Sequence, residues 1–297
     1  MTSLQLFASR RDGRSSAQVL DDLVSKAVLA EQAGFDTVWL AEHHASDWNL
    51  CTDPLTVLGY LARATSRIQL GAAVVNLGLH HPVRIAEQAA LVNSLSGGRL
   101  ELGLGKGFAA ADYLRFGLDP AGRDERFQAS HDELMTLLRS DPETSGIPTW
   151  LSSSGHPRAV AAAVEHGHGL LLAAAGTKLK TITSYVAEQP APPRLGLVRA
   201  VHTGRTEIEA EQELMPYLLW YMGEMAKLQP GSSAPPVEEV VETFCLLGTA
   251  KECAARIEAL RTEHGIGEVI TVPGIGGMSL DLAGRVITEL GAAGRDG

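Results

Sequence analysis

Glu42, His43 and His44 form the segment of this sequence best suited to proton chemistry. They follow an apolar run that predicts a β-strand at Thr37–Leu40. An imidazole has an intrinsic pKa that suits proton transfer near neutral pH. We expect His43 to donate or carry a proton, and we interpret His44 as a structural residue held by hydrogen bonds.

Two adjacent histidines beside a glutamate also suggest a metal site. Neighbouring residues at the end of a strand point in opposite directions, so His43 and His44 cannot easily bind one ion. A third ligand could come from His80-His81, although nothing in the sequence fixes that distance. We predict no metal site here and interpret His80 as structural.

Lys106 lies between Gly105 and Gly107, directly after a predicted strand at Arg99–Leu104. Gly103, Gly105 and Gly107 do not form a dinucleotide-binding GxGxxG loop, because residue 108 is Phe where that motif requires Gly. The spacing of a Walker phosphate-binding loop is also absent. A lysine flanked by glycines lets backbone amides and an ammonium group approach an anion such as phosphate. A solvated loop lysine explains the pattern equally well.

Ser152, Ser153 and Ser154 lie between a predicted strand at Thr149–Ser152 and a helix that begins near Pro157. Their hydroxyls and the free amides of the helix start would face the same side, which suits a second phosphate contact. Ordinary helix capping by Ser154 is the alternative. The GxSxG pattern of a serine hydrolase is absent.

These residues follow strands in a repeated strand–helix pattern, which predicts one α/β domain over residues 1–297, a (β/α)8 TIM barrel with parallel strands and short insertions. A doubly wound open sheet is the competing fold, but Leu4–Arg14 lacks its glycine fingerprint. The eight predicted strands are Leu4–Ala8, Thr37–Leu40, Ile68–Val75, Arg99–Leu104, Thr149–Ser152, Gly169–Ala173, Leu195–Val201 and Val269–Val272.

Capping residues and helical periodicity predict the helices between these strands. Gln229–Pro236 is rich in Pro, Gly and Ser and predicts a loop or lid. The predicted helices are Ser15–Gly34, Asp53–Thr65, Pro82–Leu95, Arg123–Arg139, Pro157–His166, Thr206–Leu228, Thr249–His264 and Leu280–Leu290. Eight strand–helix units account for the whole chain.

The composition limits the partners. The net charge of -10 and a pI near 5.5 disfavour nucleic acid and anionic membranes. Cys51, Cys245 and Cys253 form no CxxC pair, which argues against disulfides and structural zinc. No run of apolar residues is long enough to cross a membrane, and Leu4–Ala8 precedes the basic N-terminal residues, the reverse of a secretory signal. We expect a cytoplasmic protein.

The segment from Ala33 to Pro120 contains GFDTVWLAEHH, LGAAVV, HPVRIAEQ and SGGRLELGLGKG in this order. It resembles the luciferase-like flavin-dependent monooxygenases, and Gly248–Thr262 is similar to the closing helix of that family. The resemblance implies a barrel that binds FMN at the carboxyl ends of its strands. It also implies that reduced FMN (FMNH2) and O2 form a flavin C4a-hydroperoxide, which oxygenates a small organic substrate.

The resemblance also implies roles for individual residues. His43 matches the catalytic histidine of the family, and Ala73-Val74 matches a non-proline cis peptide under the flavin ring. Lys106 takes the position of a phosphate-binding residue that is more often arginine. The implied cofactor-binding residues are Glu42, Ala73, Val74, Lys106, Ser152, Ser153 and Ser154.

Two other functions remain open on the same scaffold. A deazaflavin-dependent oxidoreductase would transfer hydride without oxygen, and an accessory protein would bind flavin without turnover. The intact His43 argues against the accessory protein. We expect a separate flavin reductase to supply FMNH2, because no nicotinamide fingerprint is visible.

The substrate is the least defined part. Trp39, Trp48, Phe108, Trp220 and Tyr221 either line a pocket for an aromatic or long apolar compound or pack in the core. We expect a secondary-metabolite substrate and a role in antibiotic biosynthesis.

We also expect a homodimer that forms through the predicted helices Asp53–Thr65 and Pro82–Leu95. Packing of these helices against the barrel explains their apolar residues equally well.

Overall fold

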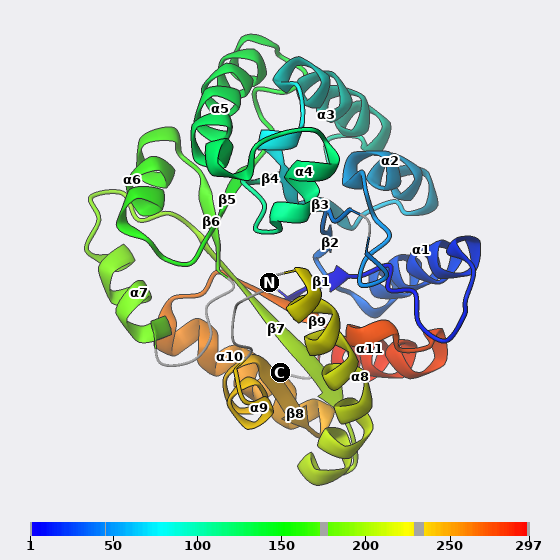
Figure 1. Cartoon of the computed structure of the whole chain (residues 1–297). Helices are drawn as coiled ribbons and strands as arrows, with labels where there is room; N and C mark the ends of the chain where they lie inside the picture. The colour runs from blue at the N-terminus through cyan, green and yellow to red at the C-terminus, as the bar shows by residue number, and fades with distance from the viewer. Residues whose placement is uncertain (1, 45, 173–177, 229–234, 296–297) are drawn as a thin grey trace.

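The computed structural model describes residues 2–44, 46–172, 178–228 and 235–295, and it contains a closed parallel barrel with helices around it (Figure 1). Pairing of β6 with β7 closes the ring, which excludes the open sheet. The barrel strands are β1 (Thr2–Leu6), β2 (Thr37–Leu40), β3 (Gln69–Asn76), β4 (Leu100–Gly105), β5 (Thr149–Ser153), β6 (Gly169–Leu172), β7 (Leu195–Thr203) and β9 (Glu268–Val272).

All the predicted helices are confirmed to within a few residues: α1 (Ser16–Ala33), α2 (Pro54–Ala64), α3 (Pro82–Ser96), α5 (Arg123–Ser140), α6 (Pro157–His166), α8 (Glu207–Leu228), α10 (Ala250–His264) and α11 (Leu280–Ala293). Local signals define their ends. Ser15 caps α1 in a capping box with Gln18, and Gly34 ends this helix in the left-handed conformation.

The expectation that eight units account for the whole chain was wrong. The structure adds helices α4 (Ala110–Arg115), α7 (Leu179–Ala187) and α9 (Val237–Phe244), the strand β8 (Cys245–Gly248) and short 3-10 turns η1 (Leu77–Leu79), η2 (Pro120–Gly122) and η4 (Ile275–Gly277). The three added helices are short, and none begins with a side-chain cap. Their starts therefore carry no capping signal, although α5, which was predicted, also begins without a side-chain cap.

Two strand predictions also need comment. The first strand is Thr2–Leu6 rather than Leu4–Ala8, because Ala8 has already left the sheet and its amide donates to Asn49 Oδ1 at 3.0 Å. Ala173, predicted as the end of the sixth strand, and residues 229–234 of the predicted loop lie outside the described residues.

Two tryptophans fill the centre of the barrel. The rings of Trp39 and Trp150 meet edge to face, with centroids 5.8 Å apart. A β-carbon at Gly71 would overlap the Trp39 ring, and one at Gly169 would overlap the Trp150 ring. These inward-facing strand positions must therefore be glycine for the rings to fit. Trp39 is a core residue and does not line a pocket.

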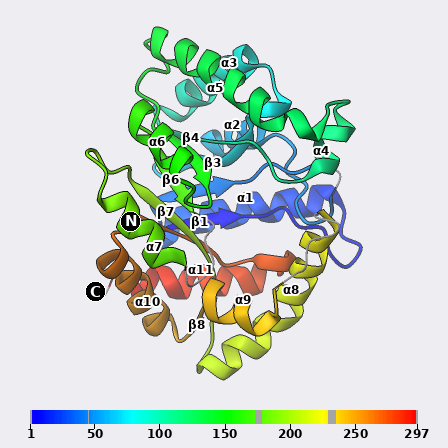
Figure 2. The ribbon, with the colours of Figure 1, turned by 60° about the vertical axis from the view of Figure 1, so that its left-hand side comes forward.

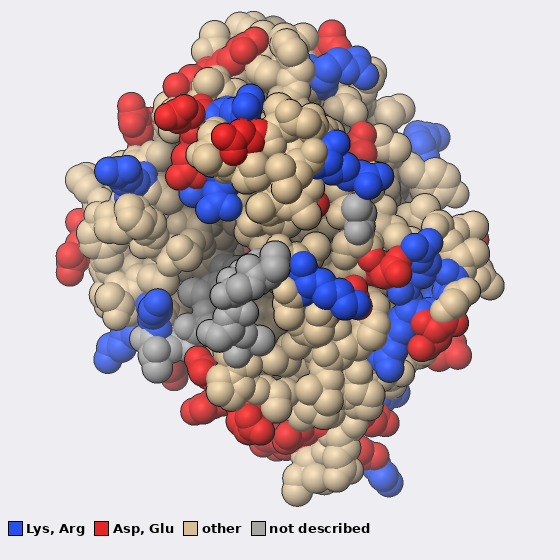
Figure 3. All heavy atoms as spheres, in the orientation of Figure 1, with Lys and Arg blue, Asp and Glu red and all other residues tan. Residues whose placement is uncertain are grey.

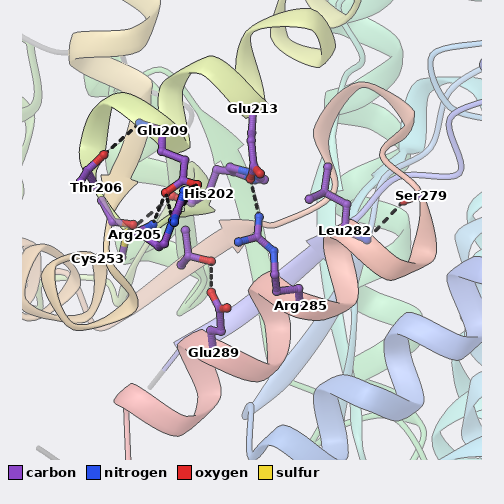
Figure 4. A network of polar contacts seen from close by, with 12 residues as sticks. His202, Arg205, Thr206, Glu209, Glu213, Cys253, Ser279, Leu282, Arg285 and Glu289 are labelled. Carbon is purple, nitrogen blue, oxygen red and sulfur yellow. Dashed lines mark hydrogen bonds and ion pairs between the residues drawn. The ribbon is translucent and has the colours of Figure 1, made fainter.

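Polar contacts tie α8 and α11 to β7 (Figure 4). Glu213 on α8 contacts His202 at 3.0 Å and also pairs with Arg285 on α11. The hydroxyl of Thr203 donates to Glu289 of α11 at 2.5 Å. Figure 2 shows α8 and α9 beside β8, the strand that pairs with the carboxyl end of β7. These contacts fix α8, which carries Tyr221 toward the barrel mouth.

Among the helices that the structure describes, none is both long enough and apolar enough to cross a membrane.

Candidate active site

The carboxyl ends of β3, β4 and β5 bring predicted site residues together. A β-carbon at Gly105 would overlap Val74 and would lie 3.6 Å from Ser152 Cβ. Gly107 has a φ of +66°, and its β-carbon would lie 3.2 Å from the side chain of Asn76. The glycines on both sides of Lys106 therefore let three strand ends approach one another.

The peptide bond between Ala73 and Val74 is cis, as predicted. The carbonyl of Ala73 accepts a hydrogen bond from Gln5 Nε2 of β1 at 3.2 Å. The side chains of Ala73 and Val74 pack against the cluster that contains Trp39 and Trp150. Val74 thus lies directly above the aromatic centre of the barrel.

His43 is buried beside two aromatic rings. Its ring centroid lies 3.9 Å from that of Trp48 and 5.6 Å from that of Phe108. Burial lowers the pKa of His43 to about 3, so the imidazole is neutral at pH 7. Within the described part of the chain, His43 Nδ1 is buried without a hydrogen-bond partner, and so is Trp48 Nε1.

Trp48 joins several elements at this point. Its ring centroid lies 5.1 Å from Phe7 and 5.7 Å from Tyr221 of α8. The Ser9 hydroxyl donates to the Trp48 carbonyl at 2.7 Å. Trp48, Phe108 and Tyr221, three of the aromatic residues considered for a pocket, therefore form one wall around His43.

Trp220 lies elsewhere. It lines a separate polar cavity of about 620 Å³ with Arg10, Arg11 and Arg14 of the loop after β1 and with Asp47 of the loop after β2. Figure 3 shows charged side chains of both signs spread over the face seen in Figure 1, with no single basic area for a large anion.

Glu42 holds the two histidines that we interpreted as structural. Its Oε1 contacts His44 Nε2 and His80 Nε2, each at 2.8 Å, and its Oε2 accepts from the Asn76 amide at 2.9 Å. Burial alone would raise the pKa of Glu42, but the hydrogen bonds from His44 and His80 hold it below its usual value. The interpretation of His44 and His80 is confirmed.

Both carboxylate oxygens of Glu42 are thus already engaged within the protein. Direct contact of Glu42 with a cofactor remains a prediction. The sequence did not show whether His80 lies near enough to Glu42 and His44 to complete a metal site. In the structure, ligand atoms of these three residues lie within 4.8 Å of one another.

The Glu42–His80 pair should make stability depend on pH. Burial opposes the charged imidazole, but the hydrogen bond to Glu42 outweighs it and raises the pKa of His80 above 6.5. The stabilisation is therefore complete below the unfolded-state pKa of about 6.5 and is lost as the pH rises through the folded-state pKa. Urea unfolding across this range should show a decline for the wild type that His80→Gln lacks. Parallel pH profiles for the two proteins would refute this role of His80.

Lys106 is less free than the sequence indicated. Its Nζ donates to Asp124 Oδ1 of α5 at 2.7 Å, and both side chains are exposed. The hydroxyl of Tyr113 donates to the Lys106 carbonyl at 2.5 Å and fixes the turn. Because an exposed ion pair contributes little stability, Lys106 can exchange Asp124 for another anion at small cost.

The serine run lies at the end of β5 as predicted, but capping of α6 by Ser154 was wrong. His156 caps this helix, and its Nδ1 accepts from the Arg158 amide at 3.2 Å. Ser153 Oγ accepts from the Gly155 amide at 2.9 Å. The hydroxyls of Ser152 and Ser154 have no hydrogen-bond partner among residues 2–44, 46–172, 178–228 and 235–295.

The fold and this arrangement define a barrel enzyme scaffold with its polar site at the strand carboxyl ends. The family model described as luciferase-like monooxygenase matches residues 1–267. The chain therefore belongs to the luciferase-like monooxygenase family.

Curated relatives resemble the chain over parts of their length. The protein y4vJ of Sinorhizobium fredii is 32% identical over 60% of this chain and 56% of its own length. The 4-hydroxyprotoasukamycin monooxygenase of Streptomyces nodosus is 34% identical over 45% and 39%, respectively. The chain thus spans about half or less of these two relatives. The limonene 1,2-monooxygenase of Rhodococcus erythropolis is 26% identical over 79% and 70%.

Solved structures share the fold over nearly the full length. Monooxygenase RslO1 from Streptomyces bottropensis has a TM-score of 0.86 and 19% identity, covering 98% of this chain and 97% of its own. The oxygenating constituent of 3,6-diketocamphane monooxygenase from Pseudomonas putida, in complex with FMN, has a TM-score of 0.76, 19% identity and 97% coverage of both chains. The coenzyme F420-dependent tetrahydromethanopterin reductase of Methanopyrus kandleri has a TM-score of 0.71 and 17% identity, covering 98% and 96%.

Proposed function

We propose that the chain is an FMNH2-dependent monooxygenase that transfers oxygen to a small apolar organic substrate. One observation carries the proposal. Two buried nitrogen atoms without partners, His43 Nδ1 and Trp48 Nε1, belong to rings whose centroids lie 3.9 Å apart after the carboxyl end of β2. A buried polar atom without a partner costs about 1–3 kcal/mol, so this site is built for a ligand that supplies the missing contacts.

The residues present fit FMN. Gly105 admits no side chain, because a β-carbon would overlap Val74, and this keeps the surface at the strand ends open to a flat ring. Lys106 and the unengaged hydroxyls of Ser152 and Ser154 suit the phosphate, since they combine a cation with hydrogen-bond donors.

Reduced FMN supplies, when bound, the electrons that activate oxygen. The neutral imidazole of His43 can donate a proton from one ring nitrogen and accept one at the other. Its Nδ1 is the atom that we assign to holding this proton near the reacting oxygen. The wall of Trp48, Phe108 and Tyr221 keeps water from that proton.

The aromatic wall and the names of similar proteins support proposals for the partner and the substrate. We propose that a separate flavin reductase supplies FMNH2, as the description of the camphane enzyme as an oxygenating constituent suggests for that protein. An aromatic wall favours an apolar, ring-containing substrate. The names of the asukamycin and limonene relatives support a secondary metabolite, and we propose a role in antibiotic biosynthesis.

We also propose a homodimer. Tyr60 on α2 and Leu91 and Leu95 on α3 are exposed, which leaves apolar area on the two helices that we expect at the interface. A second copy of the chain would cover these side chains.

Replacing Lys106 with Ala should weaken FMN binding roughly tenfold, because one charge-assisted hydrogen bond to the phosphate is lost. Riboflavin, which lacks the phosphate, should bind the wild type and Lys106→Ala equally. Equilibrium dialysis with both flavins measures this difference. Asp124→Ala is the matched control, since it removes the carboxylate that competes for Lys106. An equal loss for FMN and riboflavin would remove Lys106 from the phosphate site.

Product formation under two conditions tests the proposed function. The protein is incubated with reduced FMN in air, and with reduced deazaflavin under nitrogen, against aldehydes, sulfonates and polycyclic aromatics. We expect product only with reduced FMN and oxygen. Product only with deazaflavin under nitrogen would replace oxygen transfer by hydride transfer, and flavin binding without any product would favour an accessory protein.

A further inference from the structure

Three histidines converge outside the barrel mouth, where α5 meets the end of α6 and the start of β6. The ring centroid of His131 on α5 lies 4.9 Å from His166, the last residue of α6, and 5.1 Å from His168. His131 and His168 are buried, whereas His166 is partly exposed. The proposed monooxygenase chemistry uses none of them.

A chain of hydrogen bonds fixes the central imidazole. His131 Nε2 contacts His168 Nε2 at 2.9 Å, and His168 Nδ1 contacts the Thr149 hydroxyl at 2.7 Å. At the other end, His131 Nδ1 lies 3.3 Å from Asp132 Oδ1. Because the Thr149 hydroxyl can donate or accept, the two hydrogen bonds of His168 can be made in either direction, whereas the Asp132 carboxylate can only accept.

The two directions of the hydrogen-bond chain differ in what His131 Nδ1 presents to Asp132, a hydrogen or a lone pair. When Thr149 donates, His131 Nδ1 carries a hydrogen and donates it to Asp132. When Thr149 accepts, His131 donates from Nε2 to His168, and its Nδ1 offers a lone pair toward the carboxylate. Two acceptors that face each other need a cation between them. A metal ion can take that place, and because His131 and His168 stay neutral in both directions, its binding shifts the tautomers and releases no proton.

Ligand atoms of His131, Asp132 and His166 lie within 4.8 Å of one another. The 3.3 Å between His131 Nδ1 and Asp132 Oδ1 equals the separation of two ligands on a tetrahedral ion with bonds of about 2.0–2.1 Å. The His166 ring forms no hydrogen bond with the described part of the chain. Asp132 is exposed, so a water can complete the coordination.

We propose that His131, Asp132 and His166 bind a divalent transition-metal ion of the Zn²⁺ type, which ties α5 to α6. Two imidazoles and one carboxylate are the ligands that such ions prefer. Thr149 orients His168, and His168 orients His131 by a hydrogen bond to the ring nitrogen that does not face the metal. Arg139 donates to the His166 carbonyl at 3.2 Å, and this nearby positive charge makes the site weaker than a structural zinc centre.

Glu42, His44 and His80 form the other candidate group in the described residues. There the histidine nitrogens are already bound to the carboxylate, and a metal would have to break a buried ion pair. In the outer cluster a metal would replace the contact between His131 Nδ1 and the exposed Asp132, whose Oδ1 also accepts from Gln128 Nε2 at 2.9 Å. A metal at the outer cluster would be lost in His166→Gln, whereas a metal at Glu42, His44 and His80 would be lost in His80→Gln.

Isothermal titration with Zn²⁺ alone tests the proposal on untagged, chelator-treated protein, and Co²⁺ absorption reports the coordination. The wild type should bind one ion. His166→Gln should weaken binding at least tenfold, and Thr149→Val about 10–100-fold through the loss of its support for His168. His264→Gln, at the end of α10, is the matched control and should leave the affinity unchanged. Absence of binding, unchanged affinity in His166→Gln, or loss of binding in His80→Gln would overturn the proposal.

Discussion

Replacing His43 with Ala is expected to lower the rate of product formation by about 10²–10⁴-fold, the contribution of a positioned proton donor or acceptor. Flavin affinity should change little, because the residues that we assign to the phosphate, Lys106, Ser152 and Ser154, lie at the ends of β4 and β5, away from β2. Turnover at saturating substrate and flavin titration measure the two effects separately. The decrease should therefore appear in kcat rather than in flavin binding.

The pH profile adds a second test of the same residue. Because burial holds the pKa of His43 at about 3, the free enzyme should show no titration of this group between about pH 5 and 8. His264→Ala, far from the strand carboxyl ends, is the control and should retain full activity. Unchanged activity in His43→Ala would remove the histidine from the mechanism.

Replacing Glu42 with Ala is expected to lower the free energy of unfolding by about 3–5 kcal/mol, the range for breaking a buried ion pair from one side. The Glu42 side chain is fully buried, and the change leaves His80 and the Asn76 amide without their acceptor. Urea unfolding at pH 7 measures the loss. Glu42→Gln should lose less, because its amide oxygen still accepts hydrogen bonds.

The hydrogen bonds of Glu42 with His44 and His80 also make the free energy of unfolding depend on pH in acid. Because the pKa of Glu42 is held low, its contribution is present above the unfolded-state value of about 4.3 and is lost as the pH falls through the folded-state pKa. Glu87→Ala, which breaks an exposed pair with Arg84, is the control and should cost about 0–1 kcal/mol. Equal losses in Glu42→Ala and Glu87→Ala would contradict the role of the buried carboxylate.

Features with local signals could be predicted from the sequence. The capping box at Ser15 and the glycine at Gly34 define α1 because both act within a few residues of the helix ends. The position of the cis bond at Ala73-Val74 followed from family resemblance over a continuous segment. The placement of His43 at a strand end followed from the strand pattern alone.

Features that depend on distant contacts could not be predicted. Asp124 reaches Lys106 from another element, and Tyr221 reaches Trp48 from α8, so no spacing indicates either contact. Nor does the sequence around Glu42 indicate that the Glu42 carboxylate contacts both His44 and His80. That the Trp48 N–H is buried without a partner depends on residues distant in sequence, so the sequence could not show it.

Labelled oxygen tests the central claim most directly. The protein is incubated with reduced FMN and ¹⁸O₂ against the substrate panel, and the products are analysed by mass spectrometry. Oxygen transfer at the His43–Trp48 site predicts one labelled oxygen atom in the product and loss of that product in His43→Ala. A product that forms without oxygen, or whose new oxygen comes from water, would contradict monooxygenase function.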